Sequence, residues 1–145
     1  MPQAIAVDDG LDRLLSRALN NPDTQFQPWT LGLFVNDLVP TRDTVLNDLE
    51  EANWAGYSRR SLDPNQWQAI TVVDHVAKAV WGTAPLAWTN NSGADVTNYG
   101  YWIYSLSYSE LMFVQRFDDV DIRAVPSGGQ IKIQPVIWAQ SIFAG

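Results

Sequence analysis

Residues 99–117 read YGYWIYSLSYSELMFVQRF, two runs of aromatic and branched residues separated by a short polar break. The runs 99–106 and 111–117 have the composition of β-strands, and the serine-rich residues 107–109 favour a turn between them. The first run is apolar on both faces, with Tyr101 and Ile103 on one and Trp102, Tyr104 and Leu106 on the other. We therefore expect one face to meet the core and the other to lie under a helix, a loop or a partner.

Similar short apolar segments occur along much of the chain. Residues 29–36 alternate Leu31, Leu33 and Val35 with small or polar residues, except at Phe34, and this pattern predicts a half-buried strand. Residues 68–81 fit both a helical face and a strand face, and their β-branched content favours the strand. The remaining expected strands are 86–89 and 131–143, and the remaining turns are 90–93 and 126–129. About seven short strands with this spacing predict a mainly β fold, an antiparallel β-sandwich or a jelly-roll-like barrel.

A short N-terminal α-helix is expected in front of the strands. It begins at Asp8 or Asp9, ends at residues 20–22, and its leucine face comprises Leu11, Leu14, Leu15 and Leu19. A helix of this length is marginal alone in water, so we expect its leucines to pack on this chain or on a neighbouring subunit. The expected domains are an N-terminal arm and helix at 1–28 and a β-sandwich domain at 29–145.

A second, brief helix is expected near 43–50. Thr41 is suited to cap it, and Val45, Leu46 and Leu49 recur at helical spacing on one face. We expect this face to point inward and the helix to last about two turns.

The chain has 145 residues, no cysteine and a formal net charge of −7. This length suits one domain with a substantial core, and the lack of cysteine excludes disulfides and thiolate nucleophiles. Because negative charge repels phosphate, we expect no nucleic-acid partner and no binding to anionic membranes. The sequence has no apolar run of about 18 residues and no basic leader, so we expect neither a membrane span nor a signal peptide.

The residues that common catalytic sites need are scarce. His75 is the one histidine, and its neighbour Asp74 points to the opposite face of a strand, so adjacency gives no dyad. No serine stands in a Gly-x-Ser-x-Gly context, and one histidine cannot build a three-histidine zinc site. The acidic run 118–121 resembles a loose calcium loop without its glycine and distal glutamate, which favours a solvated corner. The sequon at 90–92 is interpreted as a turn. We expect no enzyme activity, catalytic residue, cofactor or bound metal.

Residues 31–137 contain two series of short motifs in a fixed order. The early series is Leu33-Phe34-Val35-Asn36, Pro40-Thr41, Thr44-Val45, Asp48-Leu49, Trp54 and Gly56-Tyr57. The late series is Trp88-Thr89-Asn90, Gly100-Tyr101-Trp102-Ile103, Leu111, Arg116-Phe117, Val125, Gly129-Gln130-Ile131 and Ile133-Gln134-Pro135. Together they resemble a family of small proteins carried by tailed bacteriophages.

The resemblance implies a non-enzymatic virion component of the capsid decoration, or cement, type, which binds and stabilises the shell of the major capsid protein. Such a protein lies on the capsid surface after assembly in the cytoplasm of the host bacterium. A homo-oligomer, with a trimer favoured, suits this role. No catalytic residue of the family maps onto the chain. Many relatives begin near the first strand, so the first thirty residues are expected to be an added arm.

Partner contacts are expected from the arm and from aromatic residues. Residues 2–6 and the leucine face of the first helix are expected to reach a neighbour. The expected contact residues are Pro2, Ile5, Leu11, Leu14, Leu15, Trp54, Tyr57 and Trp102. The alternative is a carbohydrate- or receptor-binding module of a phage tail or fibre, in which Trp54, Tyr57, Trp67 and Trp102 stack on sugar rings. A hydrolase is the least favoured class.

Overall fold

The structure is a computed structural model and describes residues 5–6, 29–62, 66, 68, 71–73, 76–106, 108–122 and 124–140. Within these ranges the named elements are strands β1 to β10 and a turn of 3-10 helix, η1 (Leu46–Asp48). The strands are β1 (Ile5–Ala6), β2 (Trp29–Phe34), β3 (Arg60–Leu62), β4 (Thr71–Val73), β5 (Val76–Val80), β6 (Leu86–Thr89), β7 (Gly100–Ser105), β8 (Glu110–Arg116), β9 (Gln130–Ile133) and β10 (Val136–Gln140).

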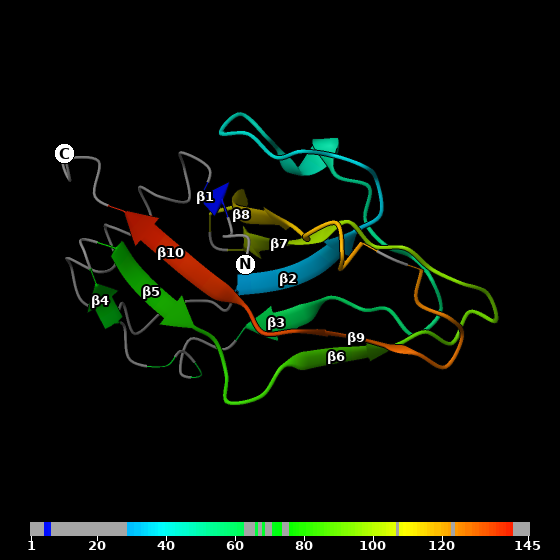
Figure 1. Cartoon of the computed structure of the whole chain (residues 1–145). Helices are drawn as coiled ribbons and strands as arrows, with labels where there is room; N and C mark the ends of the chain where they lie inside the picture. Colours follow the sequence, from blue (N-terminus) through cyan, green and yellow to red (C-terminus); the bar gives the residue numbers. More distant parts are fainter. Residues whose placement is uncertain are drawn as a thin grey trace.

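The strands pair antiparallel throughout, which confirms the predicted mainly β, sandwich-like fold (Figure 1). The main sheet has the order β1-β8-β7-β2-β3, and two smaller sheets have the orders β10-β5-β4 and β6-β9. Side chains from all three sheets meet in the main core, where Leu31 and Ile103 are buried together with Trp88 and Ile137. No helix within the described ranges has the length and apolarity needed to cross a membrane.

The β7–β8 hairpin confirms what residues 99–117 predict. β7 is buried on both faces along most of its length. One face, with Tyr101 and Ile103, joins the main core. The other face, with Trp102, belongs to a second apolar cluster that includes Leu46 and Leu49 of residues 35–50. A loop therefore covers the second face, and we call residues 35–50 the cover loop.

β2 is buried on both faces, so the prediction of a half-buried strand for 29–36 is wrong. The face of β2 that was expected to be exposed to solvent lies under the cover loop. Two glycines make room there, because Gly32 pairs with Trp102 and Gly100 pairs with Phe34. A Cβ atom on either glycine would collide with the ring opposite it. The absence of a side chain at these two positions lets both rings lie against the neighbouring strand.

The cover loop holds a single 3-10 turn in place of the predicted helix near 43–50. The side chain of Asn36 ends this turn, since its Oδ1 accepts the N–H of Glu50 at 2.8 Å and its Nδ2 donates to Asp48 O at 2.9 Å. The N–H of Glu50 is therefore not available for the hydrogen bond that would continue a helix. Leu49 is buried as expected, but Val45 is 54% exposed, so its predicted inward orientation is wrong.

Two of the predicted strands are each divided in two. Residues 68–81 contain β4 and β5, which form a hairpin with Val73 opposite Val76, and the strand preference of this segment is confirmed. Residues 131–143 contain β9 and β10, separated by residues 134–135. Pro135 has no N–H to donate to a ladder, which explains the break. The strand predicted at 86–89 is β6.

The N-terminal strand β1 lies on the edge of the main sheet of its own chain. Ile5 pairs with Val114 and Ala6 pairs with Phe113 of β8. The backbone of these two residues, expected to reach a neighbour, is thus engaged within the chain. The predicted helix and the contact residues Pro2, Leu11, Leu14 and Leu15 lie outside the described residues. The division into arm and sandwich stays a prediction.

Candidate functional site

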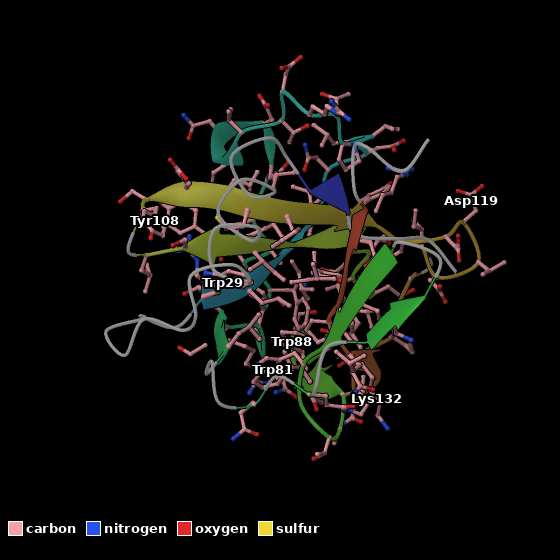
Figure 2. All side chains as sticks on the ribbon, turned by 90° about the vertical axis from the view of Figure 1, so that its left-hand side faces the viewer. Trp29, Trp81, Trp88, Tyr108, Asp119 and Lys132 are labelled. Atoms are coloured by element: carbon pink, nitrogen blue, oxygen red, sulfur yellow. The ribbon has the colours of Figure 1, made fainter. Side chains whose placement is uncertain are left out.

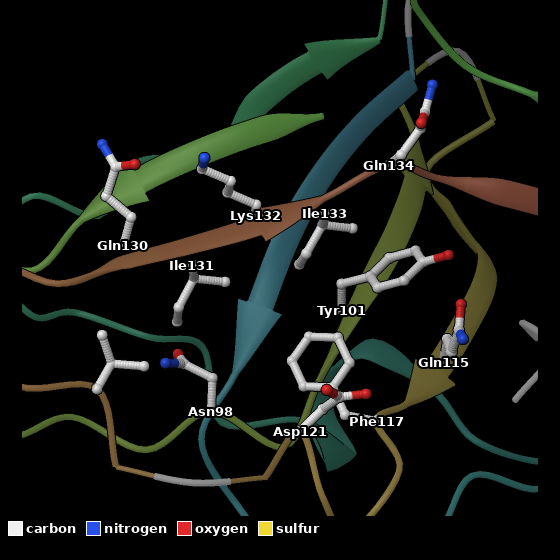
Figure 3. A pocket seen from close by; sticks show the side chains of 11 residues that line it. Asn98, Tyr101, Gln115, Phe117, Asp121, Gln130, Ile131, Lys132, Ile133 and Gln134 are labelled. Atoms are coloured by element: carbon white, nitrogen blue, oxygen red, sulfur yellow. The ribbon is translucent and has the colours of Figure 1, made fainter. Parts of the chain in front are cut away.

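A hollow of about 340 Å³ lies between β9 and the ends of β7 and β8 (Figure 3). Its described lining includes four amide side chains, two aromatic rings, three branched aliphatic side chains and two charged side chains. The amides and rings are those of Asn98, Gln115, Gln130, Gln134, Tyr101 and Phe117. A hollow with this mixture of polar and aromatic groups can bind a small polar ligand.

The loop that carries Asn98 is fixed at both ends by backbone hydrogen bonds. Val96 and Val125 exchange two hydrogen bonds, with N···O distances of 3.0 and 2.7 Å. At the other end the Tyr99 N–H donates to Phe34 O, and Tyr99 O accepts the N–H of Phe117, both at 2.9 Å. Asn98 is therefore held in a defined position between the bridge to Val125 and the start of β7.

Asn98 has a fixed amide orientation. Its side chain is buried, with 2% of the residue exposed, and its Oδ1 accepts a hydrogen bond from Trp54 Nε1 at 3.1 Å. Because an indole N–H can only donate, the atom that faces it must be the amide oxygen. The Nδ2 group is then turned away from Trp54, and it has no hydrogen-bond partner in the described part of the chain.

Two further amides of the hollow are anchored at its margin. Gln134 Nε2 donates to Gly82 O at 3.0 Å, and Gln130 Nε2 donates to Thr89 Oγ1 at 3.2 Å. The charged lining residues are Asp121 and Lys132, one of each sign. The ring centroids of Tyr101 and Phe117 lie 6.4 Å apart. Burial, partly offset by the backbone of Val136, raises the pKa of Tyr101 to about 12, so its hydroxyl stays protonated at neutral pH.

A second polar cluster, the Glu51 network, lies beside β2 at the edge of the main sheet. Arg59 donates two hydrogen bonds to the Glu51 carboxylate, both at 2.8 Å, and the Tyr57 hydroxyl donates a third at 2.6 Å. The Tyr57 oxygen accepts the N–H of Leu33 at 3.3 Å. The Arg59 guanidinium lies 4.9 Å from the centroid of the Trp102 ring. The network thus links two loops, β2 and the cover-loop cluster.

Electrostatics hold the Glu51 network in one protonation state. The hydrogen bond from Arg59 lowers the pKa of Glu51, although burial opposes this shift. Burial and the hydrogen bond to Glu51 raise the pKa of Tyr57 above its ordinary value. At neutral pH the network therefore combines a carboxylate, a neutral phenol and a guanidinium, which is the arrangement of a fixed ion pair.

The structure changes the roles of the aromatic residues that the sequence singled out. Trp102 is completely buried, so its predicted contact with a partner or a sugar ring is wrong. Trp54 is partly buried, packs against Tyr57 with ring centroids 5.8 Å apart, and holds Asn98. Tyr57 belongs to the Glu51 network. Trp67 and His75 lie outside the described residues.

Two loop motifs are explained by backbone geometry. Asn90 of the sequon is 1% exposed, and its Nδ2 donates to Ala94 O at 2.7 Å and Val125 O at 2.8 Å. Its side chain organises the predicted turn and leaves no room for a glycan. In the acidic corner, Asp118 O accepts the amides of Asp121 and Ile122 at 2.8 and 3.0 Å. No group of three or more metal-ligating side chains occurs in the described ranges.

A wider, shallower depression, the end groove, lies between the cover loop and the β7–β8 turn, with a volume of about 590 Å³. Its lining includes Val45 and Leu46 from the cover loop and Tyr104 and Leu111 from the hairpin. Apolar side chains stay exposed at this end of the molecule: Val45 at 54%, Leu106 at 50% and Tyr108 at 38%. Tyr108 and Asp119 mark opposite ends of the molecule in Figure 2.

No protein-family model matches the chain, and no curated protein matches it. The functional interpretation therefore depends on the hollow, the end groove and the motifs of the sequence. Sequence reasoning missed Asn98, whose local signal, a polar residue before an aromatic strand, is that of an ordinary loop.

Proposed function

We propose that this chain is a non-enzymatic structural component of a tailed-phage virion, a capsid decoration protein that binds the shell of the major capsid protein. The motifs that resemble the phage family support this proposal, because most motifs of the late series fall on or at the ends of β6, β7, β8 and β9 and so belong to the sandwich itself, whereas the early series, apart from Leu33-Phe34 of β2, falls in the loops between β2 and β3. The observation that carries it is the end groove.

The end groove has the composition of a protein contact surface. Val45 lines the groove, and Leu106 follows Ser105, whose strand partner Glu110 also lines it. Both apolar side chains are exposed, and a partner that removes water from them gains about 25 cal/mol for each Å² of apolar surface buried. Arg42, Asp43 and Glu110 supply charged groups around this apolar centre. Protein interfaces combine an apolar centre with a polar rim in the same way.

Oligomerisation would multiply a modest contact of this kind. A trimer presents three copies of the end groove, and the shell of a capsid presents many copies of the partner surface. Linked contacts raise the overall affinity without any new interaction at a single groove.

The test is co-sedimentation of the full-length chain with empty shells assembled from the major capsid protein. We expect the chain to sediment with the shells. The double variant Val45→Asp with Leu106→Asp should lower the bound fraction at least about tenfold, because it forces two carboxylates into an apolar contact. The single variant Val45→Asp should lower the bound fraction as well, and its matched control is Val120→Asp, which places the same single charge on a 75% exposed valine next to Asp119, at the opposite end of the molecule.

Two results would overturn the proposal. One is a wild-type chain that stays in the supernatant at every shell concentration. The other is a double variant that binds as well as the Val120→Asp control.

A further inference from the structure

The unpartnered amide of Asn98 is the feature of the hollow that the fold leaves unexplained. Trp54 fixes its orientation, so that Nδ2 is directed away from the indole. A buried N–H without an acceptor is costly, because it has lost its hydrogen bonds to water, and native structures rarely keep such a group unpaired. Asn98 belongs to the lining of the hollow, but its nitrogen is itself buried. A ligand in the hollow would reach this nitrogen only with a small shift of the lining, and an acceptor placed there would remove the cost.

The side chains around this donor favour hydroxyl groups as ligands. Each of the four amides carries both a donor and an acceptor, and a hydroxyl group also does both. Nε2 of Gln130 and of Gln134 is anchored by protein acceptors, which leaves the Oε1 atoms to accept from a ligand. Several hydroxyls on one small molecule could therefore be bound at once.

The rings of the hollow favour a ligand that also has an apolar face. Tyr101 and Phe117 line the same hollow as Asn98, and Figure 3 shows both rings beside it. A sugar ring presents C–H groups on one face and hydroxyls at its edge, which suits an aromatic surface surrounded by amides. A volume of about 340 Å³ is near the lower end of the range for small-molecule sites and suits one or two sugar rings.

The charges of the described lining favour a neutral ligand. Asp121 and Lys132 have opposite signs, and no further charged side chain of the described residues lines the hollow. An anionic ligand would meet Asp121 as well as the net charge of −7 carried by the whole chain.

We propose that this hollow is a binding site for a neutral, hydroxyl-rich ligand, namely a terminal sugar residue. Phe117, the more exposed of the two rings, packs against the C–H face with the buried Tyr101 ring next to it, and Gln130 and Gln134 bind hydroxyls at the margin. Asn98 Nδ2 donates to a ring hydroxyl once the lining in front of it has shifted. Trp54 is a positioning residue, because it acts on the ligand only through Asn98. This inference goes beyond the proposed capsid role and does not depend on it.

Saturation-transfer NMR on the full-length chain tests the proposal with defined probes. The probes are the methyl glycosides of glucose, galactose, mannose and N-acetylglucosamine, with N-acetylneuraminic acid as a charged comparison. We expect transfer to at least one neutral glycoside and a shift of the Asn98 side-chain amide signals in a ¹H–¹⁵N spectrum titrated with the same glycoside.

Asn98→Asp is the sharpest variant, because it keeps an oxygen for Trp54 to donate to and removes the NH₂ group. We expect it to weaken binding at least about tenfold, as is typical for the loss of a hydrogen bond to a buried polar group. The matched control, Asn91→Asp, makes the same change on an exposed asparagine and should bind like the wild type. If Asn98→Asp does not fold, Gln134→Ala replaces it and should weaken binding several-fold.

The proposal is overturned if no neutral glycoside receives saturation transfer, which would leave water as the partner of Asn98. Binding of the charged sugar alone would overturn it too. So would an affinity that is unchanged in Asn98→Asp or, where that variant is unfolded, in Gln134→Ala. The capsid proposal is tested separately, because the Val45→Asp, Leu106→Asp variant should keep the affinity of the wild type for the glycoside.

Discussion

The Glu51 network and the Asn98 hollow use similar residues, yet they end in opposite states. Both place a polar side chain against an aromatic residue at the margin of the core. In the network Glu51 accepts hydrogen bonds from Arg59 and Tyr57, and the Tyr57 oxygen accepts one from a backbone amide. In the hollow Asn98 is held through Oδ1 alone. The closed set of partners around Glu51 serves the fold, whereas the open donor at Asn98 is the one that the proposed ligand would complete.

The difference follows from how each cluster meets the main sheet. β3 pairs with β2 as far as Leu31, and Ala52 resumes the pairing by donating to Leu33 O at 2.9 Å. The N–H of Leu33 lies in the gap between these two stretches of pairing and has no strand partner there, so it donates to the Tyr57 hydroxyl oxygen instead. Asn98 lies in the loop before β7, where β9 pairs with β6 instead of the main sheet. No ladder of carbonyl groups runs alongside its amide.

The largest expected loss of stability is at Gly32, which faces the Trp102 ring next to the Glu51 network. Gly32→Ala places a Cβ against the Trp102 ring, on which Arg59 stacks, and should lower the free energy of unfolding by about 3 kcal/mol. Urea denaturation measures this loss. Trp102→Leu removes the ring, so the double variant should lose clearly less than the sum of the two single changes. Strict additivity would show that the ring does not occupy the space above Gly32.

Tyr57→Phe removes the group that closes the gap in β2. It leaves the buried N–H of Leu33 without its acceptor and Glu51 without one donor, and should cost about 1–2 kcal/mol in urea denaturation. An unchanged stability would mean that water satisfies this amide, and the contrast between a closed and an open cluster would lose its basis.

Acid should weaken the network through Glu51. Arg59 lowers the pKa of Glu51 in the folded chain below its ordinary value of 4.5, so the stabilisation is present above that pH and is lost as the pH falls through the lowered value. Glu51→Gln should therefore reduce the loss of stability between about pH 6 and about pH 3 by about 1 kcal/mol or less, given the partial exposure of the pair. Urea denaturation at the two pH values measures it. Equal losses in both proteins would contradict the expectation.

The smallest effect on stability is expected on the open side of the comparison. Gln130→Ala removes one hydrogen bond at an exposed residue and should change the free energy of unfolding by less than about 0.5 kcal/mol. The same variant should weaken binding of the glycoside that the wild type binds. A larger loss of stability with unchanged binding would assign Gln130 to the fold and not to the ligand.

Local pattern predicts the strands well where each run is short and bounded by turn residues. Residues 86–89 become β6, and residues 99–117 become the β7–β8 hairpin, because β-strand propensity and turn chemistry act within a few residues. The short helix near 43–50 fails because Asn36, far upstream in the sequence, takes the amide that would continue it. Interactions of this kind have no local signature.

The candidate site depends on even longer separations and was less predictable. Trp54 lies 44 residues from Asn98, and neither residue reveals the contact by its neighbours. The burial of Trp102 had a readable signal in Gly32, since a glycine inside an apolar strand often marks a close approach of a large group. That signal gains its meaning only when the register of β2 and β7 is known.

The two glycine–ring pairs also fix how β2 and β7 align. Each strand carries Gly-x-aromatic, and the antiparallel register sets each glycine against the ring of the other strand. Slipping the strands by two residues in one direction would oppose Phe34 to Trp102, and slipping in the other would oppose Gly32 to Gly100. The first alignment overfills the layer under the cover loop and the second leaves a void. A distant relative that keeps both Gly-x-aromatic triplets would therefore keep this alignment, even where its other residues have diverged.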